Sequence, residues 1–329
     1  MADPGIRDYD YLVTGGAGFI GSHLCERLLS SGASVMVLDD LSTGSMSNLV
    51  NCVSNRSFGF TEGSVCNEGL VSDIAAMCRS VIHLAAAVGV ENIIRQPVET
   101  IEVNVRGTEN VLRAAGRKRM RTFIASTSEV YGKGEAVPFS EEGDLVFGPT
   151  SRSRWSYACS KTIDEFLALA YSKDRGLPVT IGRLFNTVGP RQTGRYGMVL
   201  PRFIAQAAAG RPITVYGDGR QTRCFSLVDE VVSCIIALLA TDRSIGLAVN
   251  IGSTQEISIL DLAATVKART GSVSEIRIVP YDEAYPKDFE DMQRRVPDVR
   301  RLKELTGMAP CAGIEEIIDR ILASGIPQA

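Results

Sequence analysis

A glycine-rich turn between an apolar strand and a helix, near the start of the chain, restricts the possible folds more than any other feature. Residues 9–14 (YDYLVT) have the pattern of a short strand, and the turn GGAGFIG at 15–21 follows directly. Residues 22–29 then place leucines at the spacing of one helix face. A strand, a glycine turn and a helix in this order predict the start of a dinucleotide-binding α/β domain.

The glycines of this turn have separate physical tasks. Gly15 and Gly18 permit a tight turn and let the backbone approach a pyrophosphate, whereas Gly21 lets the helix pack closely on the strand. The amides at the start of the helix would point at the phosphates. Phe19 and Ile20 belong to the same turn, and we expect them to contact the cofactor as well.

A carboxylate ends the next strand. Residues 34–38 (SVMVL) form that strand, and Asp39 follows it. A carboxylate at this place accepts hydrogen bonds from the adenosine ribose and repels a 2′-phosphate. We therefore expect the cofactor to be NAD rather than NADP.

The alternation of strands and helices continues along the chain and predicts a Rossmann-type, doubly wound parallel sheet of the α/β class. Further strands are expected at 58–63, 80–86, 122–126 and 179–185, with helices at 102–112 and from Tyr157 to Tyr171. We expect residues 9–188 to form an NAD-binding domain and residues 189–329 to form a smaller portion that mainly binds substrate. A strand near 248–252 would return to the main sheet.

The strand at 80–86 ends in small residues. Leu84, Ala85 and Ala86 would let the backbone lie against the cofactor. Asn104 in the following helix would brace the strands beside the site, and we expect it to contact the cofactor. His83 is interpreted as a packed core residue rather than a catalyst.

Tyr157 and Lys161 stand at i and i+4, so on a helix they share one face. A phenol titrates near pH ~10, and a nearby ammonium lowers its pKa. Tyr157 would then take a proton from a substrate hydroxyl, which Thr127 or Ser126 at a strand end would hold. The alternative is an amphipathic helix that carries both residues by chance.

Composition excludes several other classes of protein. A net charge of -3 gives no reason to expect a nucleic-acid partner or an anionic membrane. No apolar run approaches the ~18 residues of a membrane span, and the first residues do not predict a signal peptide. The eight cysteines are scattered and there are two histidines, so we expect no metal site, reduced thiols and a cytoplasmic protein.

These motifs together resemble the extended short-chain dehydrogenase/reductases that act on nucleotide sugars. The resemblance runs through nearly the whole chain. It rests on TGGAGFIG at 14–21, the Tyr157–Lys161 pair, RLFNTVGPR at 183–191, VYGDGRQTRCF at 215–225 and VDE at 228–230.

The resemblance implies a UDP-sugar substrate and a set of residues that bind it. Leu200 and Arg202 would frame the base, and Arg295 would approach the diphosphate. The remaining substrate-binding residues would be Ser128, Asn186, Val215, Tyr216 and Arg223. One departure concerns the adenine, because the family often has Asp followed by Val or Ile after the third strand. This chain has Ser64 and Val65 there, which we still expect to contact the cofactor.

Glu129, in the segment TSEVYG at 127–132, resembles the UDP-glucuronic acid decarboxylases. A second cue is the segment at 285–298, which is similar to the C-terminal arginine-containing segment of the aminoarabinose-pathway decarboxylase. It makes Arg295 a catalytic candidate beside Thr127, Glu129, Tyr157 and Lys161. The alternatives are a UDP-glucose or UDP-glucuronate 4-epimerase, a nucleotide-sugar 4,6-dehydratase, and an NAD-sensing binding protein of the same fold. For Glu129 itself, the alternative is a surface carboxylate on a loop.

Two apolar stripes, at 110–115 and 166–170, lie on predicted helices. The family resemblance implies that these helices pair across a twofold axis in a homodimer. The alternative is that both stripes pack on the sheet of their own chain.

Overall fold

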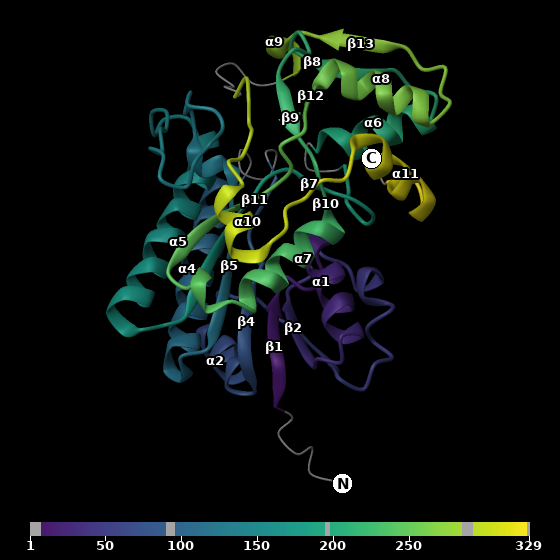
Figure 1. The fold of residues 1–329 in the computed structure, drawn as a ribbon. Coiled ribbons are helices and arrows are strands. Elements are labelled where there is room, and N and C mark those ends of the chain that lie inside the picture. The colour runs from purple at the N-terminus through teal and green to yellow at the C-terminus, as the bar shows by residue number, and fades with distance from the viewer. Residues whose placement is uncertain (1–7, 90–95, 195–197, 285–291, 328–329) are drawn as a thin grey trace.

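The computed structural model describes residues 8–89, 96–194, 198–284 and 292–327. Its centre is a seven-stranded sheet in the order β11-β6-β5-β4-β1-β2-β3, in which every neighbouring pair is parallel (Figure 1). The strands are β1 (Tyr9–Thr14), β2 (Val35–Asp39), β3 (Phe58–Glu62), β4 (Cys78–His83), β5 (Arg121–Thr127), β6 (Val179–Leu184) and β11 (Leu247–Ile251). The predicted fold class is therefore confirmed.

Helices cover both faces of this sheet. They are α1 (Phe19–Ser30), α2 (Glu68–Ala76), α4 (Pro97–Lys118), α5 (Arg154–Arg175), α7 (Val228–Leu239) and α10 (Arg300–Thr306), with 3₁₀ helices η1 (Met46–Leu49), η2 (Ser128–Tyr131) and η3 (Asp242–Ser244). Side chains of a strand alternate between the faces, so Leu12 packs with α2, α4 and α5, whereas Val13 packs with α1, α7 and α10. A buried aliphatic side chain contributes roughly 1.5–3 kcal/mol, so these two cores hold the strand ends in place.

A smaller portion lies beyond the carboxyl ends of the strands, at the top of Figure 1. Its elements are β7 (Thr187–Val188), α6 (Val199–Ala208), β8 (Ile213–Tyr216), β9 (Thr222–Cys224), β10 (Ser226–Leu227), β12 (Glu256–Ser258), α8 (Ile259–Arg269), β13 (Ile276–Val279), α9 (Tyr281–Ala284) and α11 (Ile314–Ser324). Short strand pairs and α6, α8 and α11 enclose a third core that includes Phe203, Leu262 and Ile317.

The C-terminal half of the chain also contributes to the main sheet. β11 pairs in parallel with β6, and α7 and α10 cover one sheet face. The division between residues 188 and 189 stays a prediction, because elements from both sides of it build the same core.

The structure corrects some local predictions. The first helix begins at Phe19, three residues before the predicted start, and β4 ends at His83, so residues 84–86 follow the strand instead of ending it. His83 is a core residue as predicted: it is 1% exposed, and its ring nitrogens lie 2.7 Å from Thr14 Oγ1 and 3.1 Å from Thr108 Oγ1.

The apolar stripe at 110–115 packs inward. Val111 and Leu112 are buried in the core beneath α4, together with Ala168 of α5. Phe166, in the second stripe, is 70% exposed. The predicted dimer face therefore cannot include the first stripe, because its aliphatic side chains are already covered by their own chain.

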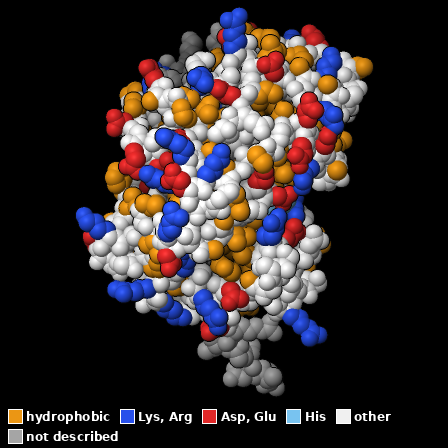
Figure 2. Space-filling view, viewed as in Figure 1, with side chains coloured by type: hydrophobic (Ala, Val, Ile, Leu, Met, Phe, Trp, Pro, Cys, Tyr) orange, Lys and Arg blue, Asp and Glu red, His pale blue; other side chains and the backbone are white. Residues whose placement is uncertain are grey.

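Charges of both signs are interspersed over the face of the molecule in Figure 2. Within the described residues, no helix has the length and hydropathy needed to cross a membrane.

Candidate active site

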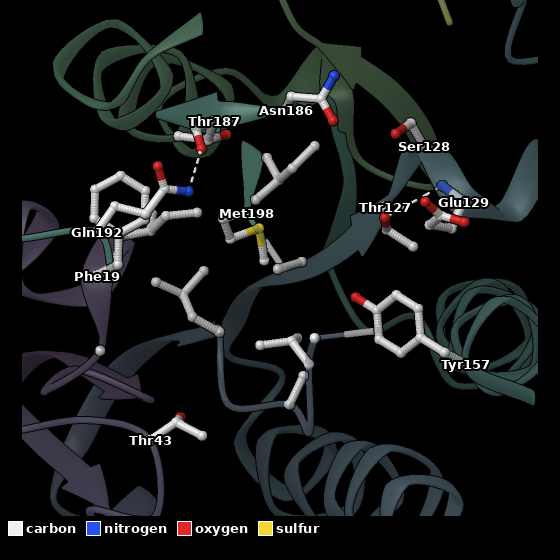
Figure 3. Close-up of a pocket in the computed structure, with 18 of the residues that line it drawn as sticks. Phe19, Thr43, Thr127, Ser128, Glu129, Tyr157, Asn186, Thr187, Gln192 and Met198 are labelled. Carbon is white, nitrogen blue, oxygen red and sulfur yellow. Dashed lines mark hydrogen bonds between the residues drawn. The ribbon is translucent and has the colours of Figure 1, made fainter. Parts of the chain in front are cut away.

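A cavity of about 510 Å³ lies at the carboxyl ends of the central strands, between the sheet and the smaller portion (Figure 3). Ligand sites of open parallel α/β sheets occur at this edge, because the loops there diverge and leave a crevice. The lining comes from the ends of β1, β2, β4, β5 and β6, from α5, and from α6 and β8 of the smaller portion. The cavity therefore reaches from the glycine turn to the predicted substrate residues.

The glycine turn forms one end of the cavity. Gly15 has a φ of 71°, and a Cβ there would lie 2.7 Å from the amide nitrogen of Ala85. A Cβ on Gly21 would collide with the carbonyl oxygen of Gly15. Gly18 is the N-cap of α1, so the first amides of the helix have no intrahelical partner. Side-chain-free backbone and unpaired amides suit a pyrophosphate.

Asp39 fixes the neighbouring loops as well as facing the cavity. Its Oδ2 accepts a hydrogen bond from Ala17 N at 2.9 Å, and its Oδ1 accepts one from Leu41 N at 2.8 Å. Burial raises the pKa of this carboxyl, although both amide contacts oppose the rise. A carboxylate has about four acceptor positions, so two remain for ribose hydroxyls.

The loops after β3 and β4 give a mixed result. Val65 lines the cavity, as do Leu84, Ala85 and Ala86. Ser64 is not among the described lining residues, and its hydroxyl accepts a hydrogen bond from Cys66 N at 3.2 Å.

Asn104 is likewise not among the described lining residues. Its Oδ1 accepts a hydrogen bond from Ala87 N at 2.9 Å, and its Nδ2 donates to Ser160 Oγ at 3.0 Å. The geometry makes Asn104 a brace between the loop after β4 and helix α5, and not a cofactor contact.

The predicted acid–base residues meet at the middle of the cavity. Figure 3 shows the Tyr157 ring reaching in from α5, near Thr127 and Glu129 at the end of β5. Thr127 is the N-cap of η2, where its hydroxyl accepts a hydrogen bond from Glu129 N at 3.2 Å. Lys161 lines the same cavity one helical turn after Tyr157. The helix and the strand end thus deliver all four residues to one place.

The predicted lowering of the Tyr157 pKa is wrong for this structure. Burial raises the pKa of Tyr157, the carboxylates of Glu129 and Asp164 raise it further, and the Thr127 hydrogen bond opposes them. Lys161 is held by Asp164, whose Oδ2 accepts a hydrogen bond from Lys161 Nζ at 2.7 Å. The residue spacing showed the lysine but not the carboxylate that offsets its charge.

Two arginines hold the Glu129 carboxylate. Arg295 Nη2 lies 2.7 Å from Glu129 Oε1, and Arg154 Nη2 lies 3.5 Å from Glu129 Oε2. Burial raises the pKa of Glu129, but the guanidiniums of Arg295, Arg154 and Arg223 together outweigh it and leave the pKa below its ordinary value. Glu129 lines the cavity, its side chain is 22% exposed, and it is paired with two arginines, so the interpretation as a surface carboxylate is wrong. In the segment at 285–298, residues 285–291 lie outside the described residues.

The smaller portion supplies the other end of the cavity. Its lining includes the predicted substrate residues Ser128, Asn186, Leu200, Arg202, Tyr216, Arg223 and Arg295. Arg202 is fixed by a hydrogen bond from Nη1 to Thr214 O at 3.0 Å and lies 4.1 Å from the Tyr216 ring centroid. Val215 is a correction: it is fully buried in the third core, because alternate residues of β8 face opposite sides.

Sequence reasoning missed Arg154 and Asp164. Arg154 stands three residues before Tyr157, and Asp164 three residues after Lys161, so each shares a helix face with a predicted catalytic residue. The three-residue spacing on one helix could therefore have indicated that both residues lie beside the predicted catalytic pair.

Comparison with known proteins gives a consistent assignment. The family model described as GDP-mannose 4,6 dehydratase matches residues 12–321. The chain is 43% identical to a UDP-N-acetyl-alpha-D-glucosaminuronate decarboxylase of Bacillus cytotoxicus, over 93% of this chain and 94% of the other. It is 37% identical to UDP-glucuronic acid decarboxylase 1 of Xenopus tropicalis, over 94% of this chain and 70% of the other.

A solved structure with the same architecture is that of DesIV, a dTDP-glucose 4,6-dehydratase from Streptomyces venezuelae with NAD and TYD bound. It superposes with a TM-score of 0.86 at 27% identity, covering 96% of each chain. The sequence match, the parallel sheet and the Tyr–Lys site agree. The chain therefore belongs to the GDP-mannose 4,6-dehydratase family, among the extended short-chain dehydrogenase/reductases that act on nucleotide sugars.

Proposed function

We propose that this protein is an NAD-dependent decarboxylase of UDP-sugar acids, with UDP-glucuronate as the favoured substrate. The observation that carries the proposal is the Glu129 carboxylate held between Arg295 and Arg154 beside the catalytic tyrosine. Relatives named as decarboxylases of UDP-glucuronate and of its 2-acetamido counterpart support it.

The residues of the glycine turn fit NAD. Gly15 and Gly21 have no Cβ, which at either position would collide with neighbouring backbone atoms. The backbone of the turn can therefore approach the cofactor closely, and the α1 amides suit its pyrophosphate. Asp39 would accept hydrogen bonds from the ribose and repel a 2′-phosphate. Bound NAD would supply the oxidant that accepts the hydride from C4 and later returns it.

The chain's own residues would handle the protons. Thr127 would orient the O4 hydroxyl, and Tyr157 would take its proton as the C4 hydride leaves. Lys161 would bind the nicotinamide ribose and favour the phenolate, and the positive charge of oxidised nicotinamide would act in the same direction. A positioned acid or base of this kind typically contributes ~10²–10⁴-fold in rate.

Oxidation at C4 makes the sugar a β-keto acid. The C5–C6 bond can then break, with its electron pair passing to the C4 carbonyl oxygen as an enolate and carbon dioxide leaving. A proton is added at C5 before the hydride returns to C4. Glu129 and Arg295 would flank C5 and the carboxylate during these steps, and Arg154 provides a second guanidinium there.

A 4-epimerase needs Thr127, Tyr157 and Lys161 but has no carbon–carbon bond to break. The pairing of Glu129 with Arg295 and Arg154 favours the decarboxylase, because guanidiniums at this place suit a substrate that carries a carboxylate, which an uncharged hexose does not.

Product analysis tests the proposal. The purified protein is incubated with NAD and either UDP-glucuronate or UDP-N-acetylglucosaminuronate, and the products are examined by mass spectrometry. We expect one of them to lose carbon dioxide. An isomer of unchanged mass would overturn the decarboxylase and favour the epimerase. Tyr157→Phe is the control, since it removes one hydroxyl and should abolish the conversion without changing the fold.

We further propose a cytoplasmic homodimer. Exposed apolar side chains gather on α4 and α5, which pack side by side: Val98, Ile101, Ile163 and Phe166. These residues replace the stripe at 110–115 as the candidate face. The eight cysteines all lie in the described part of the chain and none forms a disulfide there, which supports a reducing compartment.

A further inference from the structure

A buried ion pair stands directly behind the proposed acid–base residues. Lys161 Nζ donates a hydrogen bond to Asp164 Oδ2 at 2.7 Å, one turn along α5. The Lys161 side chain is 2% exposed and that of Asp164 is 0% exposed. Asp164 is not one of the described residues that line the cavity, so its influence on the site passes through Lys161.

Stability alone does not account for this pair. Removing two charges from water costs several kcal/mol for each ion, and an apolar pair of similar volume is often as stable or more stable. Moreover, Asp164 Oδ1 is buried and has no hydrogen-bond partner among the described residues. A buried carboxylate that is incompletely satisfied, next to a catalytic lysine, points to a use for its charge.

The far side of Asp164 is tied to the strand that leads into the glycine turn. Thr108 of α4 lies beside the carboxylate and lowers its pKa, against the larger rise that burial causes. Thr108 Oγ1 lies 3.1 Å from His83 Nε2, and His83 Nδ1 lies 2.7 Å from Thr14 Oγ1. Burial and the Lys161 charge lower the pKa of His83 to about 3, so its ring stays neutral. Lys161, and not His83, therefore neutralises Asp164.

Other charged and titratable groups act on the pair directly or through a neighbour. Tyr157 and Glu165 on α5 and His83 on β4 interact with the pair itself. Glu129 on η2 acts on Tyr157, and Arg183 on β6 pairs with Glu165. Glu165 is already paired with Arg183, whose Nη2 lies 2.7 Å from Glu165 Oε2. Glu129 is paired with two arginines. Asp164 is thus the carboxylate whose charge is matched by Lys161.

We propose that Asp164 is a positioning residue that holds the Lys161 ammonium as its counter-ion and so sets the pH at which Tyr157 loses its proton. The proposal rests on the assignment of Tyr157 and Lys161 as the acid–base pair. An ammonium has three donors, so directing one at Asp164 fixes the directions of the other two. The negative charge of Asp164 also offsets the charge of Lys161 at Tyr157, which delays ionisation of the phenol to higher pH.

The test is a titration of Tyr157 in Asp164→Asn, which keeps an oxygen acceptor for Lys161 and removes the charge. We expect the ionisation of Tyr157 to move to lower pH by about one to two units, as for unit charges roughly 6–12 Å apart at an effective dielectric constant of about 20. Ultraviolet absorbance of the phenolate is recorded with saturating NAD. Each protein is compared with its own Tyr157→Phe version, which removes the signal of the other tyrosines.

This titration needs no sugar nucleotide, so it decides the proposal even where decarboxylation fails. Asp174→Asn is the matched control, because it removes the same charge from an exposed position on α5 and should shift nothing. Asp164→Glu keeps the charge and should titrate like the unaltered protein. Where Asp164→Asn does not fold, Asp164→Ser removes the same charge and leaves room for water.

A Tyr157 titration in Asp164→Asn that is unchanged, or that moves to higher pH, overturns the proposal. In the second case Lys161 has lost its proton, and Asp164 merely keeps it charged. Where the enzyme is active, the acid limb of kcat should move with the titration and KM should change little, because Asp164 touches no ligand.

Discussion

The guanidinium of Arg295 lies 2.7 Å from the carboxylate of Glu129, although Arg295 stands between α9 and α10 and Glu129 stands in η2, directly after β5. Both residues line the cavity that Tyr157 also lines. The contact also helps to hold the pKa of Glu129 below its ordinary value despite burial, so Glu129 is ionised at neutral pH. The proposed decarboxylation depends on this pair.

Glu129→Gln separates oxidation from decarboxylation. We expect NAD bound to the variant to be reduced when UDP-glucuronate is added, because Tyr157 and Lys161 are untouched. Carbon dioxide release should fall ~10²–10⁴-fold, the usual cost of losing a positioned acid or base. NADH absorbance and released carbon dioxide measure the two steps. Glu142→Gln, at a side chain that is 79% exposed, is the control. Normal carbon dioxide release from Glu129→Gln would remove Glu129 from the mechanism.

Arg154→Met tests whether this arginine recognises the sugar acid. A charge-assisted hydrogen bond contributes ~1.5–3 kcal/mol, so we expect UDP-glucuronate to bind about 10-fold to 100-fold more weakly. UDP-glucose has no carboxylate and should bind as it does to the unaltered protein. Isothermal titration of both ligands measures the difference. Equal losses for the two would mean that Arg154 shapes the site without selecting the acid.

We expect cofactor choice to depend on Asp39. NADP should bind at least about 10-fold more weakly than NAD, because a 2′-phosphate would meet a fixed carboxylate. Asp39→Asn should narrow that ratio, although it also loses a hydrogen bond to the Ala17 or Leu41 amide and with it some stability. Fluorescence titration with both cofactors is the measurement. Equal or tighter binding of NADP by the unaltered protein would contradict the assignment.

Phe166→Glu tests the proposed dimer face. A charge on this 70% exposed side chain should separate the protomers, because a carboxylate buried against apolar side chains has no partner. Light scattering at micromolar concentration should then show a monomer. Val273→Glu alters an equally apolar side chain that is 94% exposed after α8, and should leave the dimer intact. A monomeric unaltered protein would refute the dimer.

Local spacing in the sequence was enough to predict the strand–turn–helix start, the place of Asp39 at the end of the second strand, and the shared helix face of Tyr157 and Lys161. A turn or a single helix sets the relative positions of these residues, and neighbouring chain carries that information. The parallel sheet also followed, because strands that alternate with helices have few other arrangements.

Tertiary packing decided the rest. The ion pair of Glu129 with Arg295 joins segments that are distant in the chain. The burial of Val215 depends on which face of β8 meets the third core. That the stripe at 110–115 faces inward could likewise be known only from the position of α4 on the sheet. Burial and the carboxylates of Glu129 and Asp164 raise the pKa of Tyr157, and the Thr127 hydrogen bond opposes them. Spacing alone determines which residues are neighbours on one element, whereas desolvation and long-range pairing exist only once the elements have packed together.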